Sequence, residues 1–277
     1  MSARVPQGYF LTPMGKERKP LDRRKRQGKF FFRWLTLSAF GVLLGAFPGP
    51  TRAEPDPRGH VPPIGWIRAQ FWKHFQLGDF LLEGVLRCGN RTYPFELRTH
   101  NRELVYRFRS VPLAFRIRFD RDRTLVQEKG PRDPNWREVA PKDRTKPILD
   151  TDVSYEDLSL DFLHWTHVRS LGTDSIKTLS SWAFEAEPGN EPSQYSKVRY
   201  WISQEYFALL RADGYGSQDS PIKRLEVNAV ERMGDRYIAK EMQISRMSPE
   251  RGLSTSRTFI EVISGEQVLR ACAPKKS

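Results

Sequence analysis

Cysteine is scarce in this sequence, which holds only Cys88 and Cys272 among 277 residues. A single pair excludes a small scaffold held by many disulfides and a zinc site with four thiolate ligands. Familiar catalytic motifs are missing as well, because no Gly-x-Ser-x-Gly, no phosphate-binding loop and no His-Glu-x-x-His occurs. We therefore expect a protein that is not an enzyme and that uses no metal and no cofactor.

Acidic residues are outnumbered, since 46 Lys and Arg stand against 33 Asp and Glu and the net charge is +13. Such a charge is typical of nucleic-acid-binding proteins. The excess is concentrated, however: residues 1–53 hold eleven basic and two acidic residues, and the remaining 224 residues carry only +4. We therefore expect no nucleic-acid partner. A hydrophobic share of 38% indicates a folded chain rather than a disordered one.

Long apolar runs are also absent. The uncharged stretch 34–47 has 14 residues, and a helix of that length spans about 21 Å, short of the ~30 Å hydrocarbon core of a bilayer. Basic residues at 23–29 precede it. This order is typical of a secretory signal peptide. An uncleaved signal anchor is the alternative, and Met14 is an alternative start of the chain.

The end of this leader has the features of a cleavage site. Pro48-Gly49-Pro50 breaks any helix, and small residues stand three positions and one position before a cut between Ala53 and Glu54. We therefore predict a signal peptide over 1–53 and a single domain over 54–277, located in the periplasm.

The two cysteines suit that compartment. The periplasm is oxidising, and an even number of thiols favours pairing. We predict one disulfide between Cys88 and Cys272, which would close a very long loop and tie the polar tail to an early strand. Two unpaired thiols are the alternative.

One segment near the start of the predicted domain has the spacing of an amphipathic helix. Ile64, Ile67, Phe71 and Phe75 fall on one helical face, and Gly78 ends the segment.

A second helix is predicted over 155–165. Ser154 with Asp157 three residues later is typical of a capping box at a helix start. The apolar side chains of this helix are Tyr155, Leu158, Phe162 and Trp165.

Strict alternation predicts a half-buried strand over 113–119 and another over 104–109. The apolar face of the first consists of Leu113, Phe115, Ile117 and Phe119. The opposite face of the pair holds Arg107, Arg109, Arg116 and Arg118. These arginines form a solvated strand face or contact anionic lipid head groups or an acidic partner.

Short strands joined by turns continue to the end of the domain. We expect strands at 182–186, 198–202, 206–211, 225–230, 237–244 and 258–263, with turns at 213–216 and 233–236. Sequential strands with short connections predict an antiparallel meander, and two or three helices make the class α+β.

Two groups of polar residues invite a chemical interpretation. His164-x-x-His167 is a weak metal-pair pattern, and the alternative is that these histidines end the second helix. Glu156, Asp157 and Asp161 could act as paired carboxylates, but acids are expected in a first helical turn in any case. We favour the structural interpretation of both groups.

The order of several segments resembles LolA-like outer-membrane lipoprotein-sorting proteins. The resemblance covers roughly 65–265 and is carried by 151–158, 195–202, 223–227 and 237–247. It implies a curved antiparallel sheet, a half-open β-barrel, with two or three helices over its concave face and acyl chains held between them.

This resemblance implies a periplasmic carrier, or chaperone, that transports the acyl chains of lipoproteins or lipids in an apolar cavity toward the outer membrane. Its partners would be that cargo, an inner-membrane transporter and an outer-membrane acceptor. A non-catalytic binding module or accessory protein of an envelope lipid transporter is the alternative. The expected lipid-binding residues are Leu113, Phe115, Ile117, Phe119, Leu158, Phe162 and Trp165.

Overall fold

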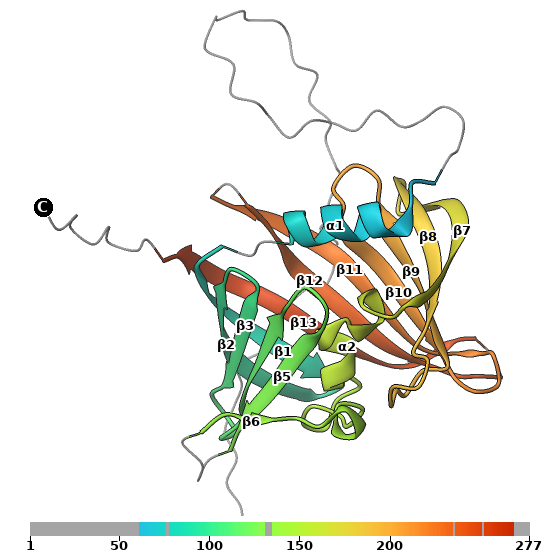
Figure 1. The fold of residues 1–277 in the computed structure, drawn as a ribbon. Helices are drawn as coiled ribbons and strands as arrows, with labels where there is room; N and C mark the ends of the chain where they lie inside the picture. Colours follow the sequence, from blue (N-terminus) through green and yellow to red (C-terminus); the bar gives the residue numbers. More distant parts are fainter. Residues whose placement is uncertain (1–60, 76–77, 131–134, 235, 251, 269–277) are drawn as a thin grey trace, which may run out of the picture. The chain divides into compact units, whose positions relative to one another are not determined.

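The described residues form one continuous antiparallel sheet of 13 strands with few helices (Figure 1). The computed structural model describes residues 61–75, 78–130, 135–234, 236–250 and 252–268. All of them belong to one compact unit, Pro50–Ser277. The predicted signal peptide and its cleavage site between Ala53 and Glu54 lie outside the described residues. No helix in the described part is long and apolar enough to span a bilayer.

The strands are β1 (Phe80–Cys88), β2 (Arg91–His100), β3 (Glu103–Phe108), β4 (Ala114–Phe119), β5 (Thr124–Lys129), β6 (Arg137–Glu138), β7 (His167–Ile176), β8 (Leu179–Glu187), β9 (Lys197–Ser203), β10 (Leu209–Tyr215), β11 (Pro221–Met233), β12 (Arg236–Met247) and β13 (Ser254–Gln267). Their order in the sheet is β6-β5-β4-β3-β2-β1-β13-β12-β11-β10-β9-β8-β7. Because β6 and β7 form opposite edges and do not pair with each other, the sheet is not closed. Figure 1 shows that it is curved. The predicted α+β class and half-open barrel are confirmed.

Alternation along β4 turns its apolar face inward, as expected. Phe115, Ile117 and Phe119 are almost wholly buried, whereas Arg116 and Arg118 lie on the other face. Burying an aromatic or branched side chain of this size contributes about 1.5–3 kcal/mol relative to leaving it exposed. Strands β8 and β9 do not alternate in this way, because runs of consecutive residues in both are buried, and they add Phe184, Tyr200 and Ile202 to the core.

The arginine face of β3 and β4 is largely compensated by its neighbours. The contacts are Arg107–Glu96, Arg109–Glu83, Arg118–Asp120, and Arg116 with the side chain of Gln127 and the ring of Trp136. Each arginine therefore has a nearby partner on the outer face. This arrangement favours the solvated-face interpretation, and contact with anionic head groups stays a hypothesis.

The predicted first helix is confirmed as α1 (Ile64–His74), which buries Ile67, Phe71 and Trp72. Its two ends contact different parts of the sheet. The ring of Trp66 lies 6.4 Å from the ring of Trp182 on β8. The ring of Trp72 lies 5.7 Å from that of Phe119 on β4. The helix therefore spans from one wing of the curved sheet to the other (Figure 1).

The second helix is shorter than predicted. Helix α2 (Tyr155–Ser159) begins with the expected capping box of Ser154 and Asp157. It ends because Leu160 has a left-handed backbone, with φ of 52°. A 3-10 turn, η2 (Asp161–Leu163), follows, so the prediction of one helix over 155–165 is wrong. Another 3-10 turn, η1 (Pro141–Asp143), lies in the proline-rich loop.

The histidines that were expected to end this helix do not do so. His164 follows η2, and His167 is the first residue of β7, a strand that the sequence analysis did not predict. Most residues of β7 are exposed, because it is an edge strand and has no apolar alternation.

The prediction of a strand at 206–211 followed by a turn at 213–216 is wrong in register. Phe207 has a φ of 51° in the turn before β10, and Asp213 and Gly214 lie inside that strand. The carboxylate of Asp213 is buried because Arg211 and Arg224 bond to it from the same face. A turn-like sequence is therefore held in a strand by ion pairs from its own strand and the next.

The predicted disulfide has one partner in the described part of the chain. Cys88 ends β1, and its thiol sulfur lies 3.8 Å from Oδ2 of Asp152. Cys272 lies outside the described residues. We expect thiol labelling of the denatured, unreduced protein to modify no cysteine, and labelling after reduction to modify two. Labelling of both cysteines without reduction would contradict the pairing.

Candidate functional site

The seven residues predicted to bind lipid face the interior, but they do not line one space. Leu113 packs against the core at its border, and the other six are buried. Phe115 and Leu158 border one small cavity, and Phe162 borders another. Phe119 lies beneath α1 instead. Their shared inward orientation agrees with the sequence analysis, and their role in lipid binding remains a proposal.

Both cavities are small in this conformation. The first has a volume of about 20 Å³, enough for about one water molecule. The second has a volume of about 10 Å³ and is lined mostly by apolar side chains. Sites for small molecules usually measure about 300–1,000 Å³. Neither of these two cavities can hold an acyl chain as it stands, so uptake at either one requires the segments over the sheet to move.

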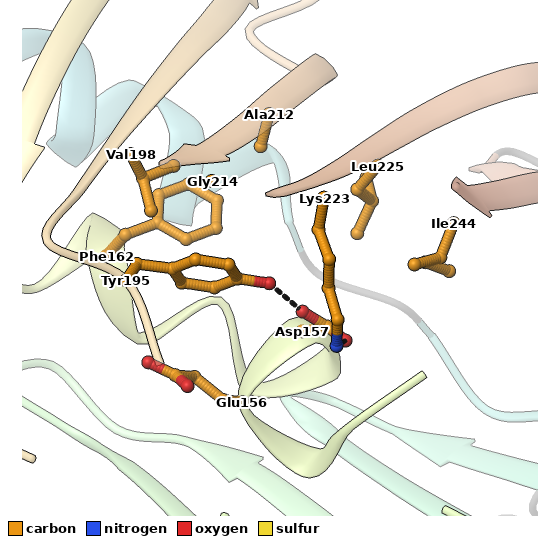
Figure 2. Close-up of a pocket in the computed structure, with 10 residues that line it drawn as sticks. All are labelled: Glu156, Asp157, Phe162, Tyr195, Val198, Ala212, Gly214, Lys223, Leu225 and Ile244. Carbon is orange, nitrogen blue, oxygen red and sulfur yellow. Dashed lines mark hydrogen bonds and ion pairs between the residues drawn. The ribbon is translucent and has the colours of Figure 1, made fainter. Parts of the chain in front are cut away.

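One wall of the larger cavity is charged (Figure 2). Asp157 of α2 accepts a hydrogen bond from the Tyr195 hydroxyl, and Nζ of Lys223 lies 2.8 Å from its Oδ2. The side chain of Asp157 is 4% exposed and that of Lys223 is 12% exposed. The backbone N–H of Ser154 donates to the same carboxylate at 2.7 Å. This ion pair joins α2 to β11, 66 residues away.

The opposite wall is apolar and comes from the second half of the sheet. Figure 2 shows Val198 and Ala212 near Phe162, and Leu225 and Ile244 on the other side of Lys223. The Tyr195 ring lies against Gly214, where an added Cβ would lie 2.2 Å from the ring. Glycine at 214 therefore permits the approach that brings the Tyr195 hydroxyl to Asp157.

Glu156 makes a second polar attachment of α2. Its carboxylate accepts hydrogen bonds from the Ser193 hydroxyl and, at 3.1 Å, from the backbone N–H of Gln194. Burial raises the pKa of Glu156 above its ordinary value, and these hydrogen bonds oppose the shift. Burial likewise raises the pKa of Tyr195, with the charge of Asp157 acting in the same direction, so its hydroxyl stays a donor.

The segment before α2 is anchored as well. Asp152 accepts hydrogen bonds from Ser256 at 2.8 Å and Thr258 at 3.2 Å, and pairs with Arg246 at 3.1 Å. Residues 152–157 are thus tied to β11, β12 and β13 through carboxylates. The segment over the sheet is therefore held by these polar contacts together with buried apolar side chains such as Val153 and Leu158.

Helix α1 is attached to the segment that follows α2 and η2. Nη2 of Arg68 donates to the backbone carbonyl of Trp165 at 2.6 Å. The Trp72 ring stacks on the imidazole of His164 with centroids 5.0 Å apart. The cover over the concave face therefore consists of α1, α2 and η2 together.

His164 is expected to make stability depend on pH. Burial lowers the pKa of His164, Arg68 acts in the same direction, and Asp161, Asp122 and a hydrogen bond with the backbone of Arg121 oppose the shift. An unfolded histidine titrates near pH ~6.5. Below that pH the unfolded chain takes up a proton that the folded chain resists. Stability present above about pH 6.5 is therefore lost as the pH falls toward the lower folded pKa.

Urea unfolding at about pH 7.5 and about pH 5.5 measures this effect. The loss of unfolding free energy on acidification should be smaller in His164→Gln than in the parent. His74→Gln, which changes an exposed histidine of α1, should retain the parental loss. Equal losses in the parent and His164→Gln would contradict the assignment.

The two chemical alternatives from the sequence find structural explanations. Glu156 and Asp157 are engaged by the hydrogen bonds above, and Asp161 pairs with Arg144 at 3.0 Å. The described residues contain no group of three or more His, Cys, Asp and Glu side chains that could hold a metal ion. These carboxylates therefore attach the cover, which explains their burial without catalysis.

Sequence reasoning missed most of the site's polar wall. Lys223 and Tyr195 lie within segments already noted for their resemblance, but neither was singled out. The available signal was the position of Lys223, a charged residue two positions before the inward-facing Leu225 and therefore on the same, inner face of the strand. Its partner Asp157 could not be identified from spacing.

Comparisons with known proteins agree on the fold. The chain matches no curated protein in sequence. A family profile described only as an uncharacterized protein matches residues 131–264. A DUF1329 family protein from Desulfovibrio piger is 16% identical with a TM-score of 0.59, over 76% of this chain and 95% of that one.

Two further solved structures are similar. A domain from Vibrio parahaemolyticus, whose description assigns it to outer membrane lipoprotein sorting, is 16% identical with a TM-score of 0.59, over 73% of this chain and 90% of that one. A LolA superfamily protein from Nitrosomonas europaea is 12% identical with a TM-score of 0.53, over 75% and 94%. Likeness at such low identity shows that the chain has the fold of these proteins.

Proposed function

We propose, from the fold that this chain shares with LolA-superfamily proteins, that it is a non-catalytic carrier of acyl chains in the bacterial envelope. Its cargo would be a lipoprotein or a lipid, received from an inner-membrane transporter and passed toward an outer-membrane acceptor. The predicted signal peptide over 1–53 supports a periplasmic location.

The observation that carries the proposal is the construction of the interior. An apolar concave face is covered by short helical segments, α1 and α2–η2, rather than by a second sheet. These segments are attached to the sheet by polar contacts of Asp152, Asp157 and Arg68. Such a cover can separate from the sheet without unpairing the strands.

Burial of an acyl chain provides free energy that opposes the cost of separating the helical segments from the sheet. An acyl chain of about 15 methylenes gains on the order of 12 kcal/mol on leaving water, at ~0.8 kcal/mol each. Breaking a buried ion pair by loss of one partner costs about 3–5 kcal/mol. The gain from the cargo has to offset these polar contacts and also the apolar contacts of side chains such as Ile67, Phe71 and Leu158, which the cargo would replace.

A second candidate is a binding module that carries no lipid, for example an accessory protein of an envelope lipid transporter. The filled interior, with cavities of about 20 and about 10 Å³, favours this alternative. The two candidates differ in whether lipid is found with the protein.

Native mass spectrometry of the chain, expressed with its leader and purified from the envelope without detergent, tests the proposal. A carrier should show discrete added masses of lipid that disappear after solvent extraction, and the extracted protein should take up a fluorescent fatty acid. Protein without added mass and without uptake would overturn the carrier function and leave the binding module.

A further inference from the structure

Three buried polar atoms converge on one place in the described part of the chain. They are Nε of Arg68, Nε2 of His164 and the hydroxyl of Tyr200, the buried side-chain nitrogen and oxygen atoms of the described residues that make no hydrogen bond of good geometry. Arg68 bonds to Trp165, the residue after His164. The charge of Arg68 lowers the pKa values of both His164 and Tyr200, and a long hydrogen bond between the side chains of Arg68 and Tyr200 lowers that of Tyr200 further. The three groups therefore face one region between α1, η2 and β9.

The guanidinium of Arg68 has no carboxylate partner among the described residues, although Asp161 and Asp122 act on the neighbouring His164. Arg68 makes no ion pair with any described residue, and its guanidinium bonds to a neutral backbone carbonyl instead. The half-buried Arg144, by contrast, pairs with Asp161. A guanidinium held partly away from water, without a carboxylate, favours an anion beside it.

The other two groups fit the same ligand. Burial raises the pKa of Tyr200, and Arg68 opposes the shift, so the phenol keeps its proton and can donate. Nε of Arg68 also carries a donor hydrogen. An anion nearby would favour the protonated imidazole of His164, whose Nε2 would then become a third donor. Three donors in one buried region match the oxygens of a carboxylate or a phosphate.

The surroundings are aromatic. The ring of Tyr200 lies 5.3 Å from that of Phe162 and 5.5 Å from that of Phe184, and Trp72 stacks on His164. Tyr200 itself is 1% exposed. A ligand that places an anionic oxygen here would continue into the apolar interior.

We propose that Arg68 and Tyr200, with His164, bind the anionic oxygen at the end of an acyl lipid. This inference rests on the proposed carrier function and adds to it the chemical class of cargo: an acyl chain that ends in a carboxylate or a phosphate. The aromatic rings contact the start of the chain, and movement of α1 admits it.

The experiment compares ligands that differ in charge but not in chain. Binding of oleate, oleyl alcohol and oleoyl lysophosphatidylglycerol to the delipidated chain is measured for the parent, Arg68→Gln, Tyr200→Phe and Arg102→Gln. Arg102 is the matched control, because its Nη2 also donates to an α1 region carbonyl, that of Trp72 at 3.0 Å. Both arginine variants therefore lose an attachment of α1, but only Arg68 contributes one of the three buried polar atoms and lies beside His164 and Tyr200.

We expect Arg68→Gln to weaken oleate binding by about tenfold or more, as for loss of a charge-assisted hydrogen bond, and to leave oleyl alcohol binding unchanged. Tyr200→Phe should show a smaller loss of the same selectivity, and Arg102→Gln none. A stronger effect on the phosphate lipid than on oleate would identify the phosphate as the preferred anion.

Three results would overturn the anion site. Arg68→Gln could bind oleate as the parent does, it could lose oleate and oleyl alcohol equally, or the parent could bind oleyl alcohol as tightly as both anionic lipids. In all three cases the parent still binds lipid, so the carrier function survives. A parent that binds none of the three ligands removes the carrier function and the anion site together.

Discussion

Phe162→Asp is expected to abolish acyl-chain uptake. Phe162 is buried, and its side chain borders the cavity that Asp157 and Glu156 also line. The substitution would place a third carboxylate beside two buried ones, without a cation of its own. A buried charge without a partner costs several kcal/mol, so the interior that must accept an acyl chain would become hydrated or would rearrange.

Uptake of a fluorescent fatty acid measures this effect, with circular dichroism to establish that the variant is folded. Phe259→Asp is the matched control, because Phe259 lies on the outer face of β13 beneath the guanidinium of Arg87. Phe162→Leu keeps the site apolar and should retain uptake, so loss in the aspartate variant can be separated from loss of the ring. A folded Phe162→Asp protein with parental uptake would contradict the proposed site.

Asp157→Ala is expected to lower the free energy of unfolding by about 3–5 kcal/mol, the usual cost of leaving one partner of a buried ion pair. Lys223 would remain 12% exposed with its charge uncompensated, and the Tyr195 hydroxyl and the backbone N–H of Ser154 would lose their acceptor. Because these contacts hold α2 to the sheet, fatty-acid uptake should also become faster.

A double-mutant cycle with Lys223→Met separates the pair from other effects. If the two residues stabilise the cover through each other, the double variant should be more stable than the sum of the single losses predicts. Asp120→Ala is the control, since the Asp120–Arg118 pair is exposed and such pairs contribute little. Additive losses in the cycle, or an effect of Asp120→Ala as large as that of Asp157→Ala, would contradict this account.

The sequence by itself determined the elements that follow from local chemistry. The period of two over 113–119 was sufficient to predict β4 and its inward face, because successive side chains of a strand point to opposite sides. The face of α1 and the capping box at Ser154 follow from neighbours three or four residues apart. The antiparallel meander was predictable because short turns between alternating segments leave few other arrangements, whereas its curvature was implied only by the resemblance to LolA-like proteins.

Only the tertiary structure decided which distant residues meet. Leu160 takes a left-handed conformation that its own side chain does not favour, and β7 forms by pairing with β8 although most of its residues are exposed. The contacts of Asp157 with Lys223 and of Arg68 with Trp165 join residues 66 and 97 positions apart. No periodicity records such pairings, because they depend on how the whole sheet curves. The volume left between the sheet and its cover likewise depends on side-chain packing from both wings.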